Sequence, residues 1–324
     1  MARWALDPDQ LEEPLHGLRS LSGSLRGDPD SLIVGHACGV SVSHVVDVTR
    51  RWPLDFGICP APLRTYHCGV TPTATAAALP SGWWAGPLET NRDQQAADAL
   101  YQLSFGYSAP TYRLNPLLLS ALGRTGGSVI GVKTDREELV GFAYGFHAVD
   151  ERGPYHYSQA AVVHPEYQGY GIGTHLKHQQ RDFTIRRTGV DRMRWTFHPS
   201  LARNAHLNLA KLGGLAIAYD PDYYDLPESE RLVVEWTFAG DAYQAHRDAA
   251  PAAAAALADR ATEVVVPEAT IDRAHWVIAG LDRVSLLAAI ADRFAAGDVL
   301  CWAGRIDSKR AAYLAVPRTD GAAR

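Results

Sequence analysis

Three closely spaced glycines, Gly169, Gly171 and Gly173, restrict the fold of this chain more than any other feature. They lie between a predicted strand at residues 155–164 and a predicted helix at residues 172–188, whose apolar side chains recur at helical spacing. Glycine permits positive φ and close backbone approach, and the N–H groups of such a loop bind anions together with the free N–H groups of the next helix. The segment therefore predicts a pyrophosphate site formed by Gln168, Gly169, Tyr170, Gly171, Ile172, Gly173 and Thr174.

The residues after this loop argue against two other kinds of phosphate site. A nicotinamide-dinucleotide fingerprint has an acidic residue at a strand end roughly 20 residues further on, and this chain lacks one there. A nucleoside-triphosphate loop ends in Gly-Lys-Ser or Gly-Lys-Thr, which is also absent. A tight strand–helix connection without any ligand is the alternative that the glycines alone leave open.

The composition is that of an ordinary globular protein, with 324 residues, 47% hydrophobic and 21% charged. A net charge of −5 and a pI near 6.2 give no reason to expect nucleic acid as the main partner. No apolar run has the length of a membrane span, and residues 1–10 lack the apolar segment of a secretory signal. We therefore expect a cytoplasmic protein with no membrane partner, whose four cysteines are reduced thiols.

The chain divides into three predicted regions. Residues 1–82 form an irregular N-terminal extension, residues 83–240 alternate strand-like and helix-like segments, and residues 241–324 form an Ala-rich linker and a small α/β appendage. The expected helices are residues 92–105, 116–123, 172–188, 203–212 and 281–295. The expected strands are residues 128–133, 139–149, 155–164, 192–198, 215–219, 231–238, 263–267 and 299–306.

The N-terminal extension contains several potential metal ligands, namely His36, Cys38, His44, Cys59, His67 and Cys68. No Cys-x-x-Cys pair is present and the spacings are irregular, unlike those of structural zinc sites. We therefore predict no metal site.

The pattern Val163-x-Pro165-x-x-Gln168-x-x-Gly171-x-Gly173 resembles the acetyl-CoA-binding motif of the GNAT superfamily of N-acetyltransferases. Four further blocks resemble a group of predicted acetyltransferases of unassigned substrate in high-GC bacteria: residues 139–146, 155–160, 193–197 and 203–209. The resemblance covers residues 83–240. It implies an α/β fold with a mixed, mostly antiparallel central sheet that is flanked by helices and splayed at the motif strand.

The resemblance also implies a cofactor. In this superfamily the pantetheine arm of the acyl donor enters the gap beside the motif strand, which carries a bulge, and pairs with the strand backbone. Acetyl-CoA or another acyl-CoA is therefore the expected co-substrate, with backbone groups of Ala161 and Val163 as partners of the arm. Asn204 and Asn208, near one face of the second motif helix, are expected to contact the cofactor, or alternatively to make polar contacts within the protein.

Direct acyl transfer needs a base for the amine and a proton donor for the departing thiolate. In the superfamily a Tyr four residues before the glycine that ends the second motif helix often supplies that proton, and Leu209 occupies the position here. Tyr219 and Tyr224 follow soon afterwards and are the predicted substitutes. His198 stands where related sequences carry Asp at a strand end, and His titrates in a useful range, so it is a candidate base or a capping residue. His156 is a further catalytic candidate.

Polar residues alternate along the motif strand, so that His156 and Ser158 are predicted to face one side and Tyr157 and Gln159 the other. One pair should face the acceptor, and a hydrogen-bonded polar core is the alternative. The predicted acceptor site combines these positions with the neighbouring strand: Tyr144, His147, Tyr157, Ser158 and Gln159.

These observations predict an acyl-CoA-dependent N-acyltransferase, acting on an amine of a small molecule and compatible with a homodimer. A non-catalytic acyl-CoA-binding or sensing module is the first alternative, which Leu209 favours. An acyltransferase of specialised metabolism that uses an acyl carrier protein is the second. It predicts a basic patch formed by Arg181, Arg186, Arg187, Arg192 and Arg194.

Overall fold

The structure is a computed structural model that describes residues 78–107, 109–257, 274–279, 283–307 and 310–319. These residues belong to one compact unit, 69–324, whereas residues 1–68 form a second unit outside the described part. The six potential metal ligands and the strand expected at 263–267 therefore lie outside the described residues. None of the helices in the described ranges combines the length and apolar character that a bilayer crossing requires.

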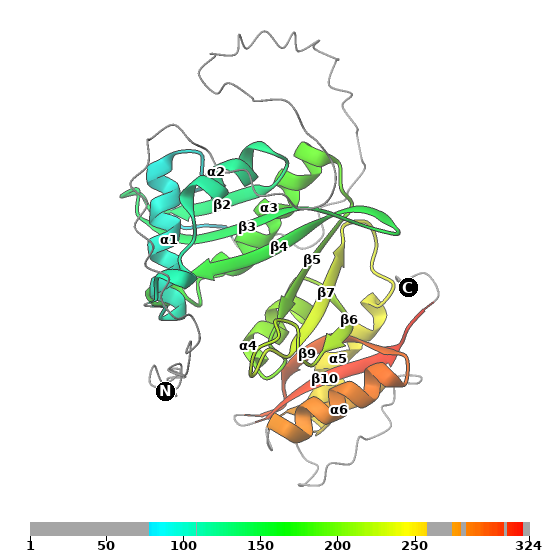
Figure 1. Cartoon of the computed structure of the whole chain (residues 1–324). Helices are drawn as coiled ribbons and strands as arrows, with labels where there is room; N and C mark the ends of the chain where they lie inside the picture. Colours follow the sequence, from blue (N-terminus) through cyan, green and yellow to red (C-terminus); the bar gives the residue numbers. More distant parts are fainter. Residues whose placement is uncertain (1–77, 108, 258–273, 280–282, 308–309, 320–324) are drawn as a thin grey trace, which may run out of the picture. The chain divides into compact units, whose positions relative to one another are not determined.

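A mixed, mostly antiparallel sheet forms the centre of this unit, as the resemblance implied (Figure 1). Within the described residues it has ten strands in the order β1-β2-β3-β4-β5-β7-β6-β9-β10-β8, and β4–β5 is the one parallel pair. The strands are β1 Trp84–Pro87, β2 Ser128–Lys133, β3 Leu139–Asp150, β4 Gly153–Val163, β5 Arg192–Phe197, β6 Leu215–Asp220, β7 Arg231–Thr237, β8 His275–Ala279, β9 Asp298–Arg305 and β10 Ala311–Pro317.

The contact between β4 and β5 is short. Only His156 with Met193 and Tyr157 with Arg194 are paired, although both strands continue beyond these positions. On the other side of β4, the register with β3 shifts between Tyr144 and Gly145, which leaves Gln159 as an extra residue. The motif strand is therefore splayed from β5 and bulged against β3, and both features were expected from the resemblance.

Helices cover both faces of the first half of the sheet. Helix α1, Asn91–Phe105, and helix α2, Pro116–Arg124, pack on one face with Leu100, Leu119 and Phe142 in their core. Helix α3, Ile172–Thr188, packs on the other face, where Ile172 and Leu176 are buried. The Thr90 and Asp93 capping box begins α1, and Asn115 caps α2 before its proline, as the sequence predicted for Asn115.

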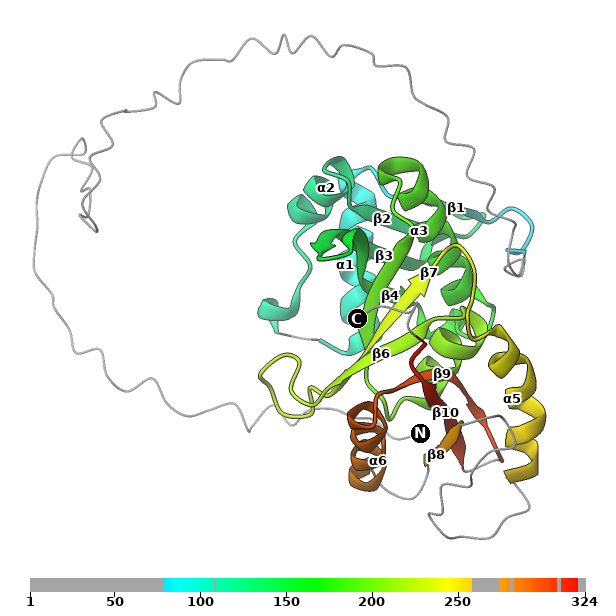
Figure 2. The same ribbon diagram turned by 90° about the vertical axis from the view of Figure 1, so that its right-hand side faces the viewer.

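The C-terminal residues differ from the expected linker and appendage. The Ala-rich segment forms helix α5, Gln244–Leu257, because alanine has the highest helix propensity and its small side chains allow close packing on the sheet. Helices α5 and α6, Arg283–Ala295, lie on opposite sides of β9 and β10 (Figure 2). Strands β8 and β10 were not predicted, since their alanine-rich sequences lack the usual strand residues.

These C-terminal strands extend the central sheet and do not form a sheet of their own. Strand β9 pairs with β6 at Ala216 and Leu300, and the two core clusters of this half include residues from both segments. Strand β1 was also missed, because it is a four-residue edge strand without a clear alternation of polar and apolar residues.

Gly145 is a position where a side chain has no room. A Cβ atom there would lie 2.3 Å from the Tyr157 carbonyl oxygen and 2.5 Å from His156 Nε2. We expect Gly145→Ala to destabilise the fold by about 1–3 kcal/mol, because overpacking forces the strand backbone to move. Gly123→Ala in α2 is the matched control, since the nearest atom to its Cβ is 4.0 Å away. The control should be neutral or stabilise by up to about 1 kcal/mol. Urea denaturation of both variants checks this, and equal stability would contradict it.

Candidate functional site

The glycine loop has the backbone geometry of an anion site. After β4, a single 3₁₀ turn, Pro165–Tyr167, leads to Gly169 and Gly171, which have φ angles of 98° and 77°. Gly171 is the N-cap of α3 and no side chain caps this helix end. The first N–H groups of α3 are therefore free to bind an anion, and the positive end of the helix dipole favours one.

A basic residue that the sequence analysis did not identify stands beside this loop. Arg203 Nη1 donates to Gln168 Oε1 at 2.8 Å, and Gln168 Nε2 donates to the Val163 carbonyl at 3.4 Å. Arg203 lies in the short helix α4, Ala202–Ala205, which continues as a π-helical segment, η4, His206–Lys211. The exposed guanidinium group adds positive charge next to the predicted pyrophosphate position.

The backbone of β4 alternates between its two sides. His164 N–H donates to the Val140 carbonyl of β3, so residues at odd numbers nearby, Ala161 and Val163, direct their backbone groups away from β3. On that side β5 has already separated from β4. This placement agrees with the predicted role of both residues as pantetheine partners.

The second motif helix is wider than an α-helix. The π-helical segment turns Asn208 inward, where its exposed fraction is 6%, while Asn204 stays on the surface. The two residues therefore do not share one face, contrary to the prediction. Leu209 is fully buried in the core with Trp195, and the His206 ring contacts the Ala303 carbonyl at 2.8 Å.

A buried polar network lies between α3 and the sheet. Lys177 Nζ donates to Ser158 Oγ at 2.7 Å, and Ser158 Oγ donates to Gln180 Oε1 at 2.8 Å. Gln180 Nε2 donates to Ser128 Oγ at 2.8 Å, which leaves the Ser128 hydroxyl proton for His156 Nε2 at 2.9 Å. The network therefore runs in one direction and holds His156 as a neutral ring protonated on Nδ1.

Burial dominates the ionisation of this network. It lowers the pKa of Lys177 to about 7 and lowers the pKa of His156 to about 3, the latter with help from Lys177 and His147. No described residue accepts a hydrogen bond from His156 Nδ1. Because His156 and Ser158 are buried against α3, they do not face the acceptor, and we retain neither His156 as a base nor Ser158 as an acceptor contact.

The opposite side of β4 carries tyrosines. The Tyr157 and Tyr223 hydroxyls are 2.9 Å apart, the Tyr157 ring lies 5.3 Å from that of Phe146, and the Tyr223 ring lies 4.8 Å from that of Tyr224. Burial raises the pKa of Tyr144 to about 12, with a smaller effect from Tyr224, so its phenol stays protonated at neutral pH. We call this group the tyrosine cluster: Tyr101, Tyr107, Tyr144, Tyr157, Tyr223 and Tyr224. Gln159 and His147 are exposed.

His198 stands at the end of β5, as predicted, beside acidic and basic groups. Its Nε2 lies 3.3 Å from Glu230, and Nδ1 lies 2.7 Å from the Ser200 hydroxyl. Burial, followed by Arg231 and Arg283, lowers the pKa of His198, so the ring is neutral near pH 7. Burial and Glu230 raise the pKa of the nearby Tyr219.

The arginines of the predicted basic patch do not form one. Arg192 and Arg194 lie at the paired end of β4 and β5 and bind Asp150 and Glu235. Arg181 is buried and pairs with Asp182, and Arg186 and Arg187 lie at the far end of α3, roughly 20 Å along the helix from the glycine loop.

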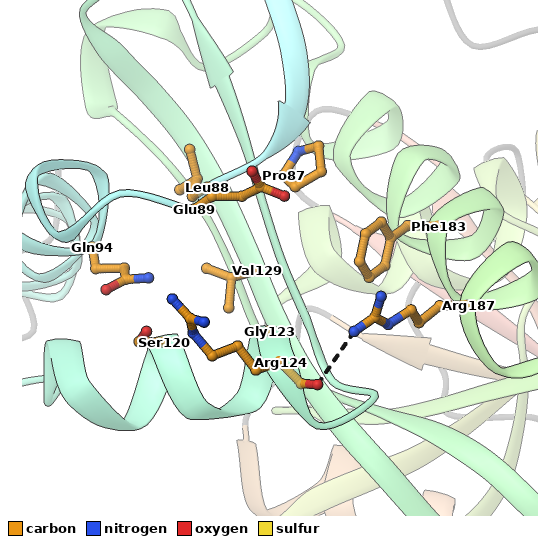
Figure 3. A pocket seen from close by; sticks show the side chains of 10 residues that line it. All are labelled: Pro87, Leu88, Glu89, Gln94, Ser120, Gly123, Arg124, Val129, Phe183 and Arg187. Carbon is orange, nitrogen blue, oxygen red and sulfur yellow. Dashed lines mark hydrogen bonds between the residues drawn. The ribbon is translucent and has the colours of Figure 1, made fainter. Parts of the chain in front are cut away.

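A cavity of about 310 Å³ lies beside β2 where β1 has ended (Figure 3). Figure 3 shows Arg124 on one side and Phe183 with Arg187 on the other, and Arg187 Nη2 donates to the Arg124 carbonyl at 3.2 Å. None of the predicted cofactor, catalytic or acceptor residues lines this cavity, so it is separate from the candidate site.

Residues 95–213 match the model of the acetyltransferase (GNAT) family. This part of the chain belongs to the GNAT family. The matched residues include α3, the glycine loop, the splayed strands and the π-helical segment. No curated protein sequence matches the chain.

Solved structures of GNAT proteins resemble the chain over about half its length. The GNAT acetyltransferase of Streptococcus pneumoniae is 12% identical, with 48% of this chain and 99% of that chain covered and a TM-score of 0.40. The NatC complex bound to Gag peptide and CoA gives 16%, 48%, 98% and 0.38 for the same four quantities. Nourseothricin acetyltransferase gives 20%, 35%, 66% and 0.32. All three TM-scores are below 0.5, so the family assignment depends on residues 95–213.

We expect Lys177→Met to stabilise the fold near pH 7. Because burial lowers the pKa of Lys177 from 10.5 to about 7, the unfolded chain binds more protons between these values, and wild-type stability rises with pH across that window. Below the window the buried charge opposes folding by about 1.4 kcal/mol per pKa unit, several kcal/mol in total. The advantage of the variant should shrink as pH rises through the window, which urea denaturation at several pH values measures.

The exposed Lys211 in η4 provides the matched control for this prediction. Lys211→Met should have the same pH dependence of unfolding as the wild type, since its ammonium group is solvated in both states. A Lys177→Met variant with a wild-type pH dependence would show that Lys177 remains charged when folded.

Proposed function

We propose that this protein binds an acyl-CoA, most simply acetyl-CoA, and transfers the acyl group directly to an amine of a small molecule. The observation that carries the proposal is the continuity of three features: the β4–β5 separation, the bulge at Gln159 and the uncapped glycine loop. They follow one another within the GNAT-matched residues.

The residues present fit a CoA molecule. Free N–H groups at the start of α3, with Arg203 nearby, suit the pyrophosphate, and the backbone of Ala161 and Val163 suits the amide groups of the pantetheine arm. Asn208 is buried and its side chain bonds to no described residue, so it is available to the arm. When bound, acyl-CoA supplies an activated thioester carbonyl.

The acceptor would approach from the tyrosine cluster. This side of β4 is aromatic and its phenols are protonated, which suits an amine with an apolar or cationic body. Tyr144 and Tyr157 are the proposed acceptor contacts, with Gln159 and His147 at the exposed edge. The bulge leaves backbone groups without strand partners near the same place, where a developing oxyanion would need a donor.

His198 is the proposed base. Its lowered pKa keeps the imidazole neutral near pH 7, and Glu230 stands within reach to stabilise the imidazolium that forms when the ring accepts a proton. Tyr219 and Tyr224 stay as proposed proton donors. Tyr224 is partly exposed above Arg231, whose guanidinium lies 5.0 Å from its ring.

A non-catalytic acyl-CoA-binding module is the second candidate function. Leu209 favours it, because the position where the family often carries an acidic hydroxyl is fully buried and apolar. A carrier-protein donor receives no support from charge, since Arg192 and Arg194 are neutralised by Asp150 and Glu235.

We expect free CoA to appear when the full chain is incubated with acetyl-CoA and a panel of small amines, detected with a thiol reagent. The rate should fall below the pKa of His198, because the protonated ring cannot accept a proton. Tight CoA binding without turnover on any amine would favour the non-catalytic module. Absence of both binding and turnover would contradict the proposal.

Gly171→Asp should weaken CoA binding at least tenfold, because the carboxylate would repel the pyrophosphate at the start of α3. Gly189→Asp is the matched control. Gly189 ends the same helix with a φ of 71°, close to the 77° of Gly171, and nothing lies within 4 Å of its Cβ position. Both variants carry a similar backbone strain, and only the first should lose affinity in titration calorimetry. Equal affinities would place the pyrophosphate elsewhere.

A further inference from the structure

Lys177 bridges β4 and β5 at the first position where the two strands separate. The last paired residues are Tyr157 and Arg194, and the next residue on each strand is Ser158 and Trp195. Lys177 Nζ lies 2.7 Å from the Ser158 hydroxyl and 4.0 Å from the centre of the Trp195 ring. The side chain therefore reaches from α3 to the apex of the separation and contacts both strands there.

The burial of this lysine is not explained by an ion pair. Its exposed fraction is 4%, and no carboxylate in the described part of the chain forms a salt bridge with it. A buried, unpaired ammonium group opposes folding, whereas an apolar side chain would fill the same place at no such expense. A group retained under that penalty, next to a proposed binding site, is a candidate for a chemical role.

The groups that face Lys177 come from three elements. Ser158 and His156 belong to β4, Trp195 belongs to β5, and Gln180 lies one turn further along α3. His156 is the titratable member of this set, and burial keeps it neutral. The charge at the apex therefore comes from Lys177.

We propose that Lys177 is a positioning residue that acts through Ser158 to bring a proton and positive charge to the sulfur of the departing CoA. This inference rests on the proposed function. It follows from the contact with both strands at the apex, and from the absence of a hydroxyl at Leu209, which leaves the leaving group without the donor that the family often uses.

The protons and bonds of the step balance as follows in the molecule. The amine nitrogen forms a bond to the acyl carbon and loses one proton to the base, while the carbon–sulfur bond breaks and its electron pair stays on sulfur. The Ser158 hydroxyl gives its proton to the sulfur and takes one from the Lys177 ammonium group. Lys177 is then reprotonated from water before the next turnover, which replaces the proton that the base releases.

The ionisation of CoA bound to the protein tests the inference without turnover. The thiolate absorbance of bound CoA is titrated against pH, with desulfo-CoA, which lacks the sulfur, as the blank. We expect the thiol pKa to be higher by about one unit when bound to Lys177→Met than when bound to the wild type, because a nearby cation favours the thiolate. Lys211→Met, with an exposed lysine, should match the wild type.

Two outcomes are distinguished by this experiment. If CoA and desulfo-CoA bind but the thiol pKa is the same in Lys177→Met and the wild type, the inference on Lys177 is wrong and the proposed function stands. If neither ligand binds the wild type, the proposed function itself fails.

A second measurement uses the unchanged protein, in case Lys177→Met does not fold. In wild-type protein with ¹³C-labelled lysine, the Cε resonance of Lys177 is titrated with CoA and with desulfo-CoA. The Lys177 pKa should be higher with CoA than with desulfo-CoA, because the thiolate favours the ammonium form. The same pKa with both ligands would show that Lys177 does not sense the sulfur, and that its role is structural.

Discussion

The short contact between β4 and β5 is the constraint on which the rest of the structure depends. Two parallel pairs hold the strands together at one end, where Arg192 binds both Asp150 and Glu235 across three strands. Beyond Tyr157 and Arg194 the strands have no hydrogen-bonding partner in each other. Backbone groups in the middle of a sheet rarely remain unpaired, since losing water without a partner is unfavourable. A ligand with its own amide groups resolves this, which is why the separation and the glycine loop belong together.

Two kinds of packing meet at this separation. On the α1 side the sheet carries protonated tyrosines and apolar residues, and on the α3 side it carries a hydrogen-bonded polar network that includes Lys177. The network runs in one direction because each donor has a single suitable acceptor, and it ends at His156. Its members are close enough that their substitution effects should be coupled rather than additive.

The C-terminal strands support the same site from the other half of the sheet. The His206 ring of the π-helical segment contacts the Ala303 carbonyl of β9, and the Tyr313 hydroxyl of β10 bonds to the Pro199 carbonyl just after β5. Arg247 of α5 donates to the carbonyls of Gly213 and Cys301. These contacts fix α4, the π-helical segment and the end of β5, so the C-terminal half of the unit helps to position residues that belong to the GNAT-matched half.

The sequence by itself determined the elements whose signals are local. Glycine spacing predicted the loop and the start of α3, Asn115 before proline predicted α2, and apolar patterns predicted β2 to β5 within two residues at each end. The orientation of His156 and Ser158 on one side of β4 also followed from strand alternation. Tertiary structure decided which side faces which helix, because that depends on the packing of α3 and not on the order of residues. It also decided the burial of Lys177, which in sequence looks like any helical lysine, the turning of Asn208 inward by the π-helix, and the helix formed by the Ala-rich segment. These outcomes depend on contacts between residues far apart in the chain, and no local pattern records them.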